Sequence, residues 1–263
     1  MAGRVTEDFT RWSRLRDIGR WYVTRFVANA AAEVPAAARV LDAGAGECAY
    51  RSLFEHAAYL GLDLSVGEPS WNYRNLDLVA RLDRLPIRSC SIDAVLCTQT
   101  LEHVTDPAAC VFEMARTLKP GGKLYLTVPM SQVEHQVPHD FFRFTSYGVR
   151  SLVERAGLAG AVVFPLGGTP ARWAYELSLY LPSMRPGPPQ HWWRSGLNPV
   201  VLLGWCLVRL AQWTLLALDR FDRKRNHPWG WAAVAVKPAL TQPAEPSGPL
   251  SCLAAPGEPP LQE

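Results

Sequence analysis

The stretch that decides the fold is VLDAGAGECAY, residues 40–50. A short apolar run ends in an acid, Asp42, and Gly44 and Gly46 follow it. Glycines at such a point let the backbone turn sharply and approach a ligand closely. Because ligands of open parallel sheets sit at the carboxyl ends of the strands, this turn is a candidate ligand site.

The glycine turn alone is compatible with two kinds of ligand. Gly44, Gly46 and Ala49 satisfy the G-x-G-x-x-A pattern of dinucleotide-binding turns, and Asp63 follows about twenty residues after the first of them. The acid at Asp42 argues against a dinucleotide, because a carboxylate repels a pyrophosphate and attracts a cationic amine. The turn favours a zwitterionic, positively charged ligand, and a purely structural strand-to-helix turn stays open as an alternative.

Apolar segments with strand and helix periods alternate along the chain. We expect strands at residues 39–41, 58–62, 92–97, 123–128, 161–166 and 231–236. We expect helices at residues 10–33, 47–56, 106–118, 146–156 and 171–181, and a turn at 119–122. This alternation predicts a doubly wound α/β fold around a parallel sheet.

Composition and charge exclude several classes of protein. The 263 residues suit one large domain, or a domain with an insertion. A formal net charge of +3 is too small to form a nucleic-acid footprint by itself. The six cysteines form no C-x-x-C pair, and residues 1–17 lack the apolar core of a signal peptide. We therefore expect a cytoplasmic protein with reduced thiols and without a cysteine-based metal site.

Six short segments point to one family. They are VLDAGAG (40–46), LDLS (62–65), RLPI (84–87), SIDAV (91–95), TLEHV (100–104) and LKPGGKL (118–124). In this order and spacing they resemble class I S-adenosylmethionine-dependent methyltransferases, most of all the type 11 group that includes ubiquinone and menaquinone methyltransferases. The resemblance implies a Rossmann-like methyltransferase sheet with an antiparallel last strand, and S-adenosyl-L-methionine as the cofactor.

The resemblance assigns cofactor contacts to the first two expected strands. Asp42, together with the backbone of Gly44 and Gly46, would hold the methionine end of the cofactor. Asp63 would accept hydrogen bonds from both ribose hydroxyls with its two carboxylate oxygens. These assignments agree with a site that prefers a cation to a phosphate.

Further contacts are expected from later segments, and one of them departs from the family pattern. Leu64 would flank the adenine, and Thr98 and Gln99 would border the sulfonium and its methyl group. Four residues before Leu85 the family usually has an acid that meets the adenine amine, but this chain has Arg81. Either Asp83 or a backbone group replaces that acid, or the affinity for the cofactor is reduced.

Methyl transfer is a direct displacement, so the protein mainly holds the reactants in line and excludes water. A base is needed only when the acceptor must lose a proton. The candidate catalytic residues are His103 in TLEHV, and His139 and Asp140 in EHQVPHDFFRFT, residues 134–145. A structural or orienting role for His103 stays open. His135, His139 and Asp140 form an alternative metal-binding set, but the reaction needs no metal and we expect none.

Residues 168–229 are expected to be a helical insertion, because they separate two strands that are adjacent and antiparallel in this fold. Its apolar segment at 199–218 has Arg209 near the centre. An insertion of this kind must leave and return on the same side of the sheet, which argues against a transmembrane crossing. Three interpretations stay open for residues 199–225: a cover for the acceptor pocket, a homodimer contact, or a helix in the membrane surface.

The sequence therefore predicts an N-terminal helical segment at 1–38, a methyltransferase domain at 39–238 and a disordered tail at 239–263, which is rich in proline and alanine. The expected function is S-adenosylmethionine-dependent O- or C-methylation of a small-molecule, lipophilic acceptor, without a nucleic-acid partner. One alternative is a catalytically silent methyltransferase-fold binding module, suggested by Arg81. The other is a nicotinamide-dependent oxidoreductase, which the glycine turn allows.

Overall fold

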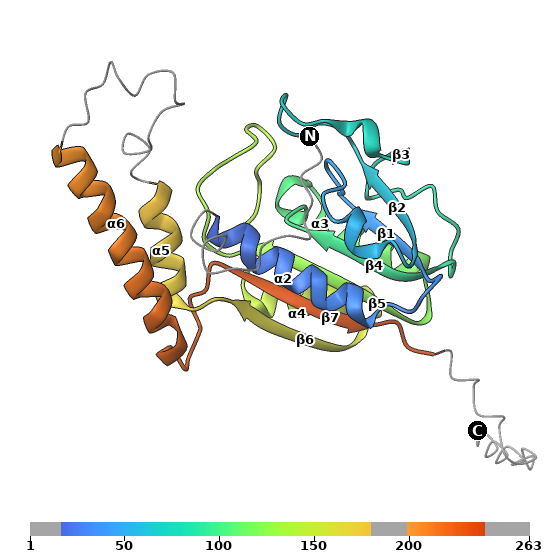
Figure 1. Ribbon diagram of the computed structural model, residues 1–263. Coiled ribbons are helices and arrows are strands. Elements are labelled where there is room, and N and C mark those ends of the chain that lie inside the picture. The colour runs from blue at the N-terminus through green and yellow to red at the C-terminus, as the bar shows by residue number, and fades with distance from the viewer. Residues whose placement is uncertain (1–16, 180–198, 240–263) are drawn as a thin grey trace, which may run out of the picture.

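The computed structural model describes residues 17–179 and 199–239, within which seven strands form one sheet (Figure 1). The strands are β1 (Arg39–Ala43), β2 (Ala58–Asp63), β3 (Leu78–Val79), β4 (Ile92–Thr98), β5 (Leu118–Pro129), β6 (Ala159–Leu166) and β7 (Gly230–Val236). Their order is β3-β2-β1-β4-β5-β7-β6. Only β7 runs antiparallel to its neighbours, β5 and β6. The predicted Rossmann-like sheet with an antiparallel last strand is confirmed.

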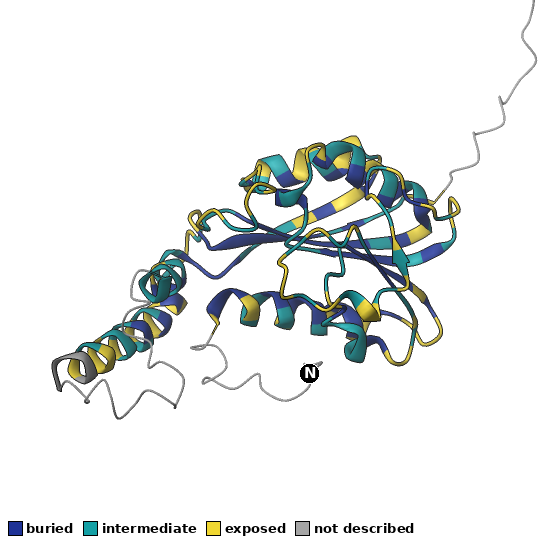
Figure 2. Ribbon diagram, turned by 90° about the horizontal axis from the view of Figure 1, so that it is seen from above, coloured by how far each residue is buried: buried dark blue, intermediate teal, exposed yellow. Residues whose placement is uncertain are grey.

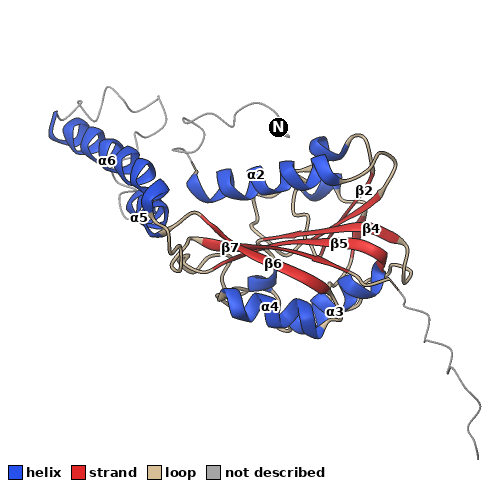
Figure 3. Ribbon diagram, turned by 90° about the horizontal axis from the view of Figure 1, so that it is seen from below, coloured by secondary structure: helices blue, strands red, loops and turns tan. Residues whose placement is uncertain are grey.

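Helices cover both faces of the sheet (Figure 3). Helix α2 (Ile18–Glu33) lies on one face, and α3 (Pro107–Thr117) and α4 (Ser146–Arg155) lie on the other. Successive residues of β4 point to opposite faces of the sheet. Val95 packs in the apolar cluster with α3 and α4, and Leu96 packs in the cluster with α2. The central strands are accordingly buried on both sides (Figure 2), as is typical of parallel sheets.

The N-terminal helix is shorter than expected. The side chain of Asp17 accepts a hydrogen bond from the backbone N–H of Arg20 at 2.9 Å, and the helix begins at Ile18. Residues 10–16 of the predicted helix lie outside the described residues. So do residues 240–263, which contain nearly all of the predicted tail, and residues 180–198 within the insertion.

The helix predicted at residues 47–56 is wrong. Only a short 3-10 helix, η1 (Arg51–Phe54), lies between β1 and β2. Gly46 and Cys48 have φ angles of 52° and 57°, a left-handed conformation that an α-helix does not contain. The glycine turn is therefore not followed by an α-helical N-terminus, and its backbone N–H groups are arranged by the turn itself.

The turn predicted at residues 119–122 is also wrong, because β5 begins at Leu118. Leu118 pairs with Ile92 of β4. The backbone N–H of Gly121 donates to the carbonyl of Lys237 at 2.8 Å, and the N–H of Lys237 donates to Gly122 at 2.9 Å. Pairing with a segment more than a hundred residues away thus makes these residues part of β5, although Gly121 keeps a left-handed φ of 82° and the register with β4 shifts between Ile92 and Ala94. The short edge strand β3 was not predicted.

The expected insertion contains a helical hairpin that extends from the end of the sheet (Figure 1). It consists of α5 (Thr169–Leu179) and α6 (Pro199–Leu218). The buried carboxylate of Asp219 accepts hydrogen bonds from the backbone N–H groups of Gly168 at 2.8 Å and Ala171 at 3.1 Å. This carboxylate fixes the end of α6 to the start of α5. Among the described residues, no helix combines the length and apolar character needed to cross a membrane.

Replacing Asp219 with alanine removes the acceptor of two buried N–H groups. We expect the free energy of unfolding to fall by about 2–4 kcal/mol, because each buried donor left without a partner costs roughly 1–3 kcal/mol. Urea denaturation followed by circular dichroism measures the loss. Glu154→Ala, at an exposed position of α4, is the control, and an equal loss in both variants would contradict the assigned role.

Candidate functional site

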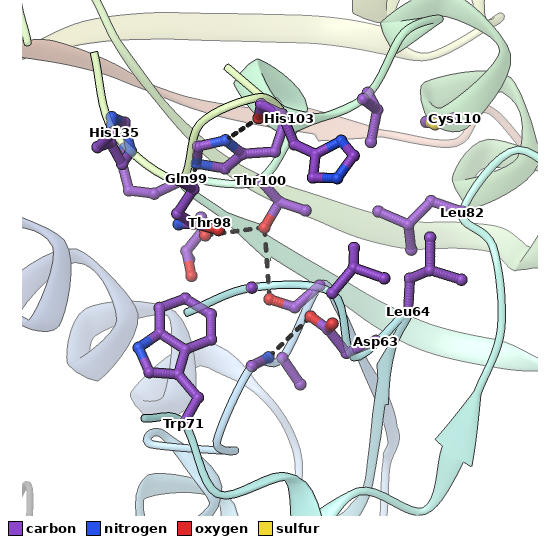
Figure 4. A pocket seen from close by; sticks show the side chains of 18 of the residues that line it. Asp63, Leu64, Trp71, Leu82, Thr98, Gln99, Thr100, His103, Cys110 and His135 are labelled. Atoms are coloured by element: carbon purple, nitrogen blue, oxygen red, sulfur yellow. Dashed lines mark hydrogen bonds between the residues drawn. The ribbon is translucent and has the colours of Figure 1, made fainter. Parts of the chain in front are cut away.

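A cavity of about 600 Å³ lies where β1, β2 and β4 end, and the loop after β5 closes another side of it (Figure 4). Its position at the carboxyl ends of parallel strands is the one expected for a ligand site. The predicted site residues that line it are Gly44, Gly46, Asp63, Leu64, Asp83, Thr98, Gln99, His103 and His139. Asp42 and Asp140 do not line it. The structure thus brings together most of the expected set, from five separate segments of the chain.

The carboxylate of Asp63 connects the ends of β1 and β2. One oxygen accepts a hydrogen bond from the backbone N–H of Gly46 at 3.0 Å, and the other accepts from the N–H of Ser65 at 2.8 Å. Each carboxylate oxygen has a second lone pair, so Asp63 can still accept hydrogen bonds from a pair of ligand hydroxyls. The side chain is therefore held in place before any ligand binds.

Gly44 is required by its surroundings. Its φ angle is 87°, and a Cβ atom there would lie 2.2 Å from Cγ2 of Thr100. The hydroxyl of Thr100 donates to the carbonyl of Thr98 at 3.0 Å, which fixes this side chain against the turn. Close approach of the turn to the end of β4 is possible only without a side chain at residue 44.

Asp42 has a different place from the one the sequence suggested. Its side chain is 1% exposed, and one carboxylate oxygen accepts a hydrogen bond from the hydroxyl of Tyr59. Burial raises the pKa of Asp42 to about 7, more than the Tyr59 hydrogen bond lowers it. Asp42 therefore lies behind the glycine turn, where it can support the turn from inside the protein. Its predicted contact with the methionine end of the cofactor stays a prediction.

The substitution noted at residue 81 creates a salt bridge at the cavity. Arg81 donates to both carboxylate oxygens of Asp83, from Nε at 2.9 Å and from Nη2 at 2.6 Å. The Arg81 guanidinium keeps the pKa of Asp83 below its usual value. Asp83 is thus ionised and paired, and each of its oxygens retains acceptor capacity. Contact between Asp83 and the adenine amine stays a prediction.

Sequence reasoning missed Trp71, which lies in the loop between β2 and β3. Figure 4 shows its indole on the opposite side of the cavity from Leu82. A Cβ atom on Gly46 would lie 3.3 Å from the indole ring, so the ring sits directly on the glycine turn. The loop is held by the N–H of Asn72, which donates to Glu47 at 2.8 Å. An isolated tryptophan in an irregular loop gives no periodic signal from which this position could be inferred.

The predicted catalytic residues separate into two groups. The rings of His103 and His139 line the cavity, and Nδ1 of His103 donates to the backbone carbonyl of His139 at 2.6 Å. Asp140 is only 3% exposed and accepts two hydrogen bonds from Arg143, at 2.7 and 2.8 Å. The Arg143 guanidinium holds the pKa of Asp140 far below its usual value. Asp140 therefore holds the loop in shape, whereas His103 faces the space where an acceptor would lie.

Comparison with known proteins relates part of this chain to a known family. Residues 41–126 match the family model of the methyltransferase domain. Over 110 aligned residues the chain is 37% identical to the ubiquinone biosynthesis O-methyltransferase of Xanthomonas axonopodis pv. citri (strain 306). The alignment covers 35% of this chain and 44% of that protein. The chain thus spans less than half the length of this relative.

Solved structures agree with the fold. A SAM dependent methyltransferase from Archaeoglobus fulgidus superposes with a TM-score of 0.53 at 14% identity, over 88% of this chain and 100% of that one. A putative sarcosine dimethylglycine methyltransferase from Galdieria sulphuraria gives 0.50 at 18% identity, over 90% and 91%. At such identities the likeness concerns the fold alone.

The matched methyltransferase domain contains only part of the cavity wall. It extends from β1 into β5 and includes the glycine turn, Asp63 and the segment from Thr98 to His103. The loop at residues 131–145 and the α5–α6 hairpin lie outside it. One side of the cavity therefore lies within the matched segment, and the opposite side is built from residues outside it.

The raised pKa of Asp42 predicts a pH-dependent stability. With a folded pKa of about 7 and an unfolded value near 3.8, the folded state binds the additional proton between these values, so rising pH destabilises it. Asp42→Asn keeps an acceptor for Tyr59 and removes the charge. We expect its stability relative to the unmodified protein to increase by about 2–3 kcal/mol between about pH 5 and about pH 8.

Urea denaturation at the two pH values measures this change, with Glu154→Gln as a control for removal of an exposed carboxylate. The assignment fails if the stability difference between Asp42→Asn and the unmodified protein is the same at both values.

Proposed function

We propose that this chain is an S-adenosylmethionine-dependent methyltransferase that acts on an oxygen or carbon atom of a small molecule. The observation that carries the proposal is the junction of the Asp63 carboxylate with the glycine turn at one end of the cavity, inside the matched domain. The cofactor would supply a methyl group on a positively charged sulfur. All other contributions come from the side chains and backbone around it.

The residues present fit this cofactor. Asp63 has two oxygens with free lone pairs for the ribose hydroxyls, and Leu64 and Leu82 line the cavity nearby as apolar neighbours for a base. Gly44 and Gly46 leave the backbone accessible for the amino-acid end. Thr98 and Gln99 lie at the end of β4, where the methyl group would point toward the acceptor side.

The charge of the cavity supports a cation over a pyrophosphate. The ionisable carboxylates that line it are Glu47, Asp63, Asp83 and Asp106, against the two arginines Arg20 and Arg81. A dinucleotide would place its pyrophosphate beside this excess of negative charge. This argues against the nicotinamide-dependent oxidoreductase. The catalytically silent binding module would bind the same cofactor without transferring its methyl group. Arg81 is the residue that favours this alternative.

The acceptor side supports a small molecule that carries a hydroxyl. His103, Gln136, His139 and Phe141 line this side and give it both polar and aromatic surface. Burial lowers the pKa of His103, so its neutral ring persists at neutral pH. The curated relative is named an O-methyltransferase, which agrees with an oxygen acceptor. A lipophilic acceptor remains part of the proposal.

The α5–α6 hairpin supports a second contact whose partner is still a prediction. Three of its exposed apolar residues, Leu203, Leu207 and Leu210, follow a helical spacing along one side of α6. The other exposed apolar residues are Trp173 of α5, Trp205 and Leu218 of α6, and Phe221 just beyond α6. The basic residues Arg220, Arg223 and Lys224 are exposed directly beyond α6. Both a membrane surface and a second copy of the chain suit such a surface.

The proposal is tested by calorimetry with S-adenosylhomocysteine. We expect Asp63→Asn to weaken binding by about tenfold to a hundredfold, since an amide offers one acceptor where the carboxylate offers two. Asp93→Asn is the matched control, because Asp93 also accepts from a backbone N–H, that of Arg39 at 2.9 Å, but at the opposite edge of the sheet. Circular dichroism checks that both variants fold.

Unchanged affinity in Asp63→Asn, or binding of NAD in place of S-adenosylhomocysteine by the unmodified protein, would overturn the proposal. Binding of S-adenosylhomocysteine without turnover of any hydroxyl-bearing acceptor would instead favour the silent module.

A further inference from the structure

Three side chains with metal-ligating atoms meet at the acceptor side of the cavity. Glu102, His103 and His135 each offer one such atom, and these atoms all lie within 4.8 Å of one another. Glu102 and His103 belong to the 3-10 helix η3 (Leu101–His103), and His135 comes from the loop after β5. Their side chains are 0%, 13% and 25% exposed, so the carboxylate lies deepest and both rings line the cavity.

The hydrogen bonds of His103 leave Nε2 without a proton, so that its lone pair faces the side chain of Gln136. Its Nδ1 lies 2.6 Å from the carbonyl oxygen of His139, which can only accept, so Nδ1 carries the proton. The amide nitrogen of Gln136 lies 3.3 Å from Nε2, as a donor to that lone pair would. Metal-binding histidines are commonly oriented in this way, by a backbone carbonyl that accepts a hydrogen bond from the ring nitrogen that does not bind the metal.

His135 is oriented in the same way. Its Nδ1 lies 3.1 Å from the carbonyl of Val133 and 3.3 Å from the carboxylate of Asp140, and both of these groups are acceptors. Nδ1 therefore carries the proton, and Nε2 keeps its lone pair. The two imidazole rings are nearly perpendicular, with centroids 4.7 Å apart. Both histidines thus have the second ring nitrogen fixed by an oxygen acceptor.

Glu102 supplies an independent sign of a missing partner. Within the described part of the chain, neither of its carboxylate oxygens has a hydrogen-bond partner, although the side chain is fully buried. A buried carboxylate is normally paired or bound to a metal. Arg143, whose charge acts on Glu102, already donates twice to Asp140. One Glu102 oxygen lies 3.9 Å from Nε2 of His103, on the same side as the proposed ligands.

We propose that Glu102 and the Nε2 atoms of His103 and His135 bind a divalent transition-metal ion of the Zn²⁺ class. Two imidazoles and one carboxylate are a ligand set that suits such ions, and three protein ligands leave positions open. Bond lengths near 2.1 Å require the three side chains to close by about 1 Å and Gln136 to withdraw. The ligands differ from the set suggested by the sequence, because the ring of His139 packs against Phe141 and Asp140 binds Arg143.

This inference rests on the proposed function, for which it names the group that activates the acceptor. A hydroxyl on an open position of the ion would release its proton to water more readily. The oxygen lone pair would then form the new bond to the methyl carbon while the electrons of the C–S bond return to sulfur. His103 would act through the ion rather than as a base, and the acceptor would be a hydroxyl compound.

The test is a titration of the full chain, stripped with a chelator, with Co²⁺ and with Zn²⁺. We expect one ion per chain and a visible Co²⁺ spectrum that Zn²⁺ abolishes. His135→Ala and Glu102→Gln should each weaken binding by more than about tenfold, because each removes a ligand. The matched control is His139→Ala in the same loop, which keeps the backbone carbonyl that His103 uses and should retain the spectrum.

Absence of stoichiometric binding by the unmodified chain would overturn the metal site, as would binding that neither Glu102→Gln nor His135→Ala weakens. S-adenosylhomocysteine affinity is measured on the same samples. If the unmodified chain binds S-adenosylhomocysteine but no metal, only the metal site is wrong. If the unmodified chain does not bind S-adenosylhomocysteine, the proposed function is contradicted.

Discussion

The site depends on one carboxylate, that of Asp63, which accepts hydrogen bonds from the backbone N–H groups of Gly46 and Ser65. These two bonds join the turn after β1 to the end of β2, two neighbouring parallel strands. The turn has no α-helix behind it, so its shape depends on such contacts rather than on helix geometry. A charged acceptor forms stronger hydrogen bonds than a neutral one, which suits a residue that must hold a turn and receive a ligand.

The wall of the cavity around this junction comes from residues inside the matched segment and from residues outside it. The matched methyltransferase domain supplies the glycine turn, Asp63 and the end of β4. The loop after β5 brings His135 and His139 to the cavity and is held by Arg143 and Asp140. The α5–α6 hairpin is attached at the same edge of the sheet through Asp219. Part of the cavity wall therefore comes from a segment that the family match does not include.

The sequence predicted the sheet well because its strands are short apolar runs bounded by motifs in a known order. It failed where a distant contact overrides a local signal, as in the glycine-containing segment before Lys123, which pairs with Lys237. It also failed at Cys48, since a left-handed conformation at a residue other than glycine leaves no mark in the sequence. Nine residues that line the cavity were predicted from motifs. The inward position of Asp42 and the contact of Trp71 with the turn were not, because both depend on packing.

The central claim is that Asp63 and the glycine turn hold an amino-acid nucleoside at the carboxyl edge of the sheet. A crystal structure of the full chain with S-adenosylhomocysteine tests it most directly. The account predicts both ribose hydroxyls within hydrogen-bond distance of the Asp63 carboxylate, and the amino-acid end along residues 44–46. A ribose placed elsewhere in the cavity, with the Asp63 carboxylate contacting only Gly46 and Ser65, would contradict it.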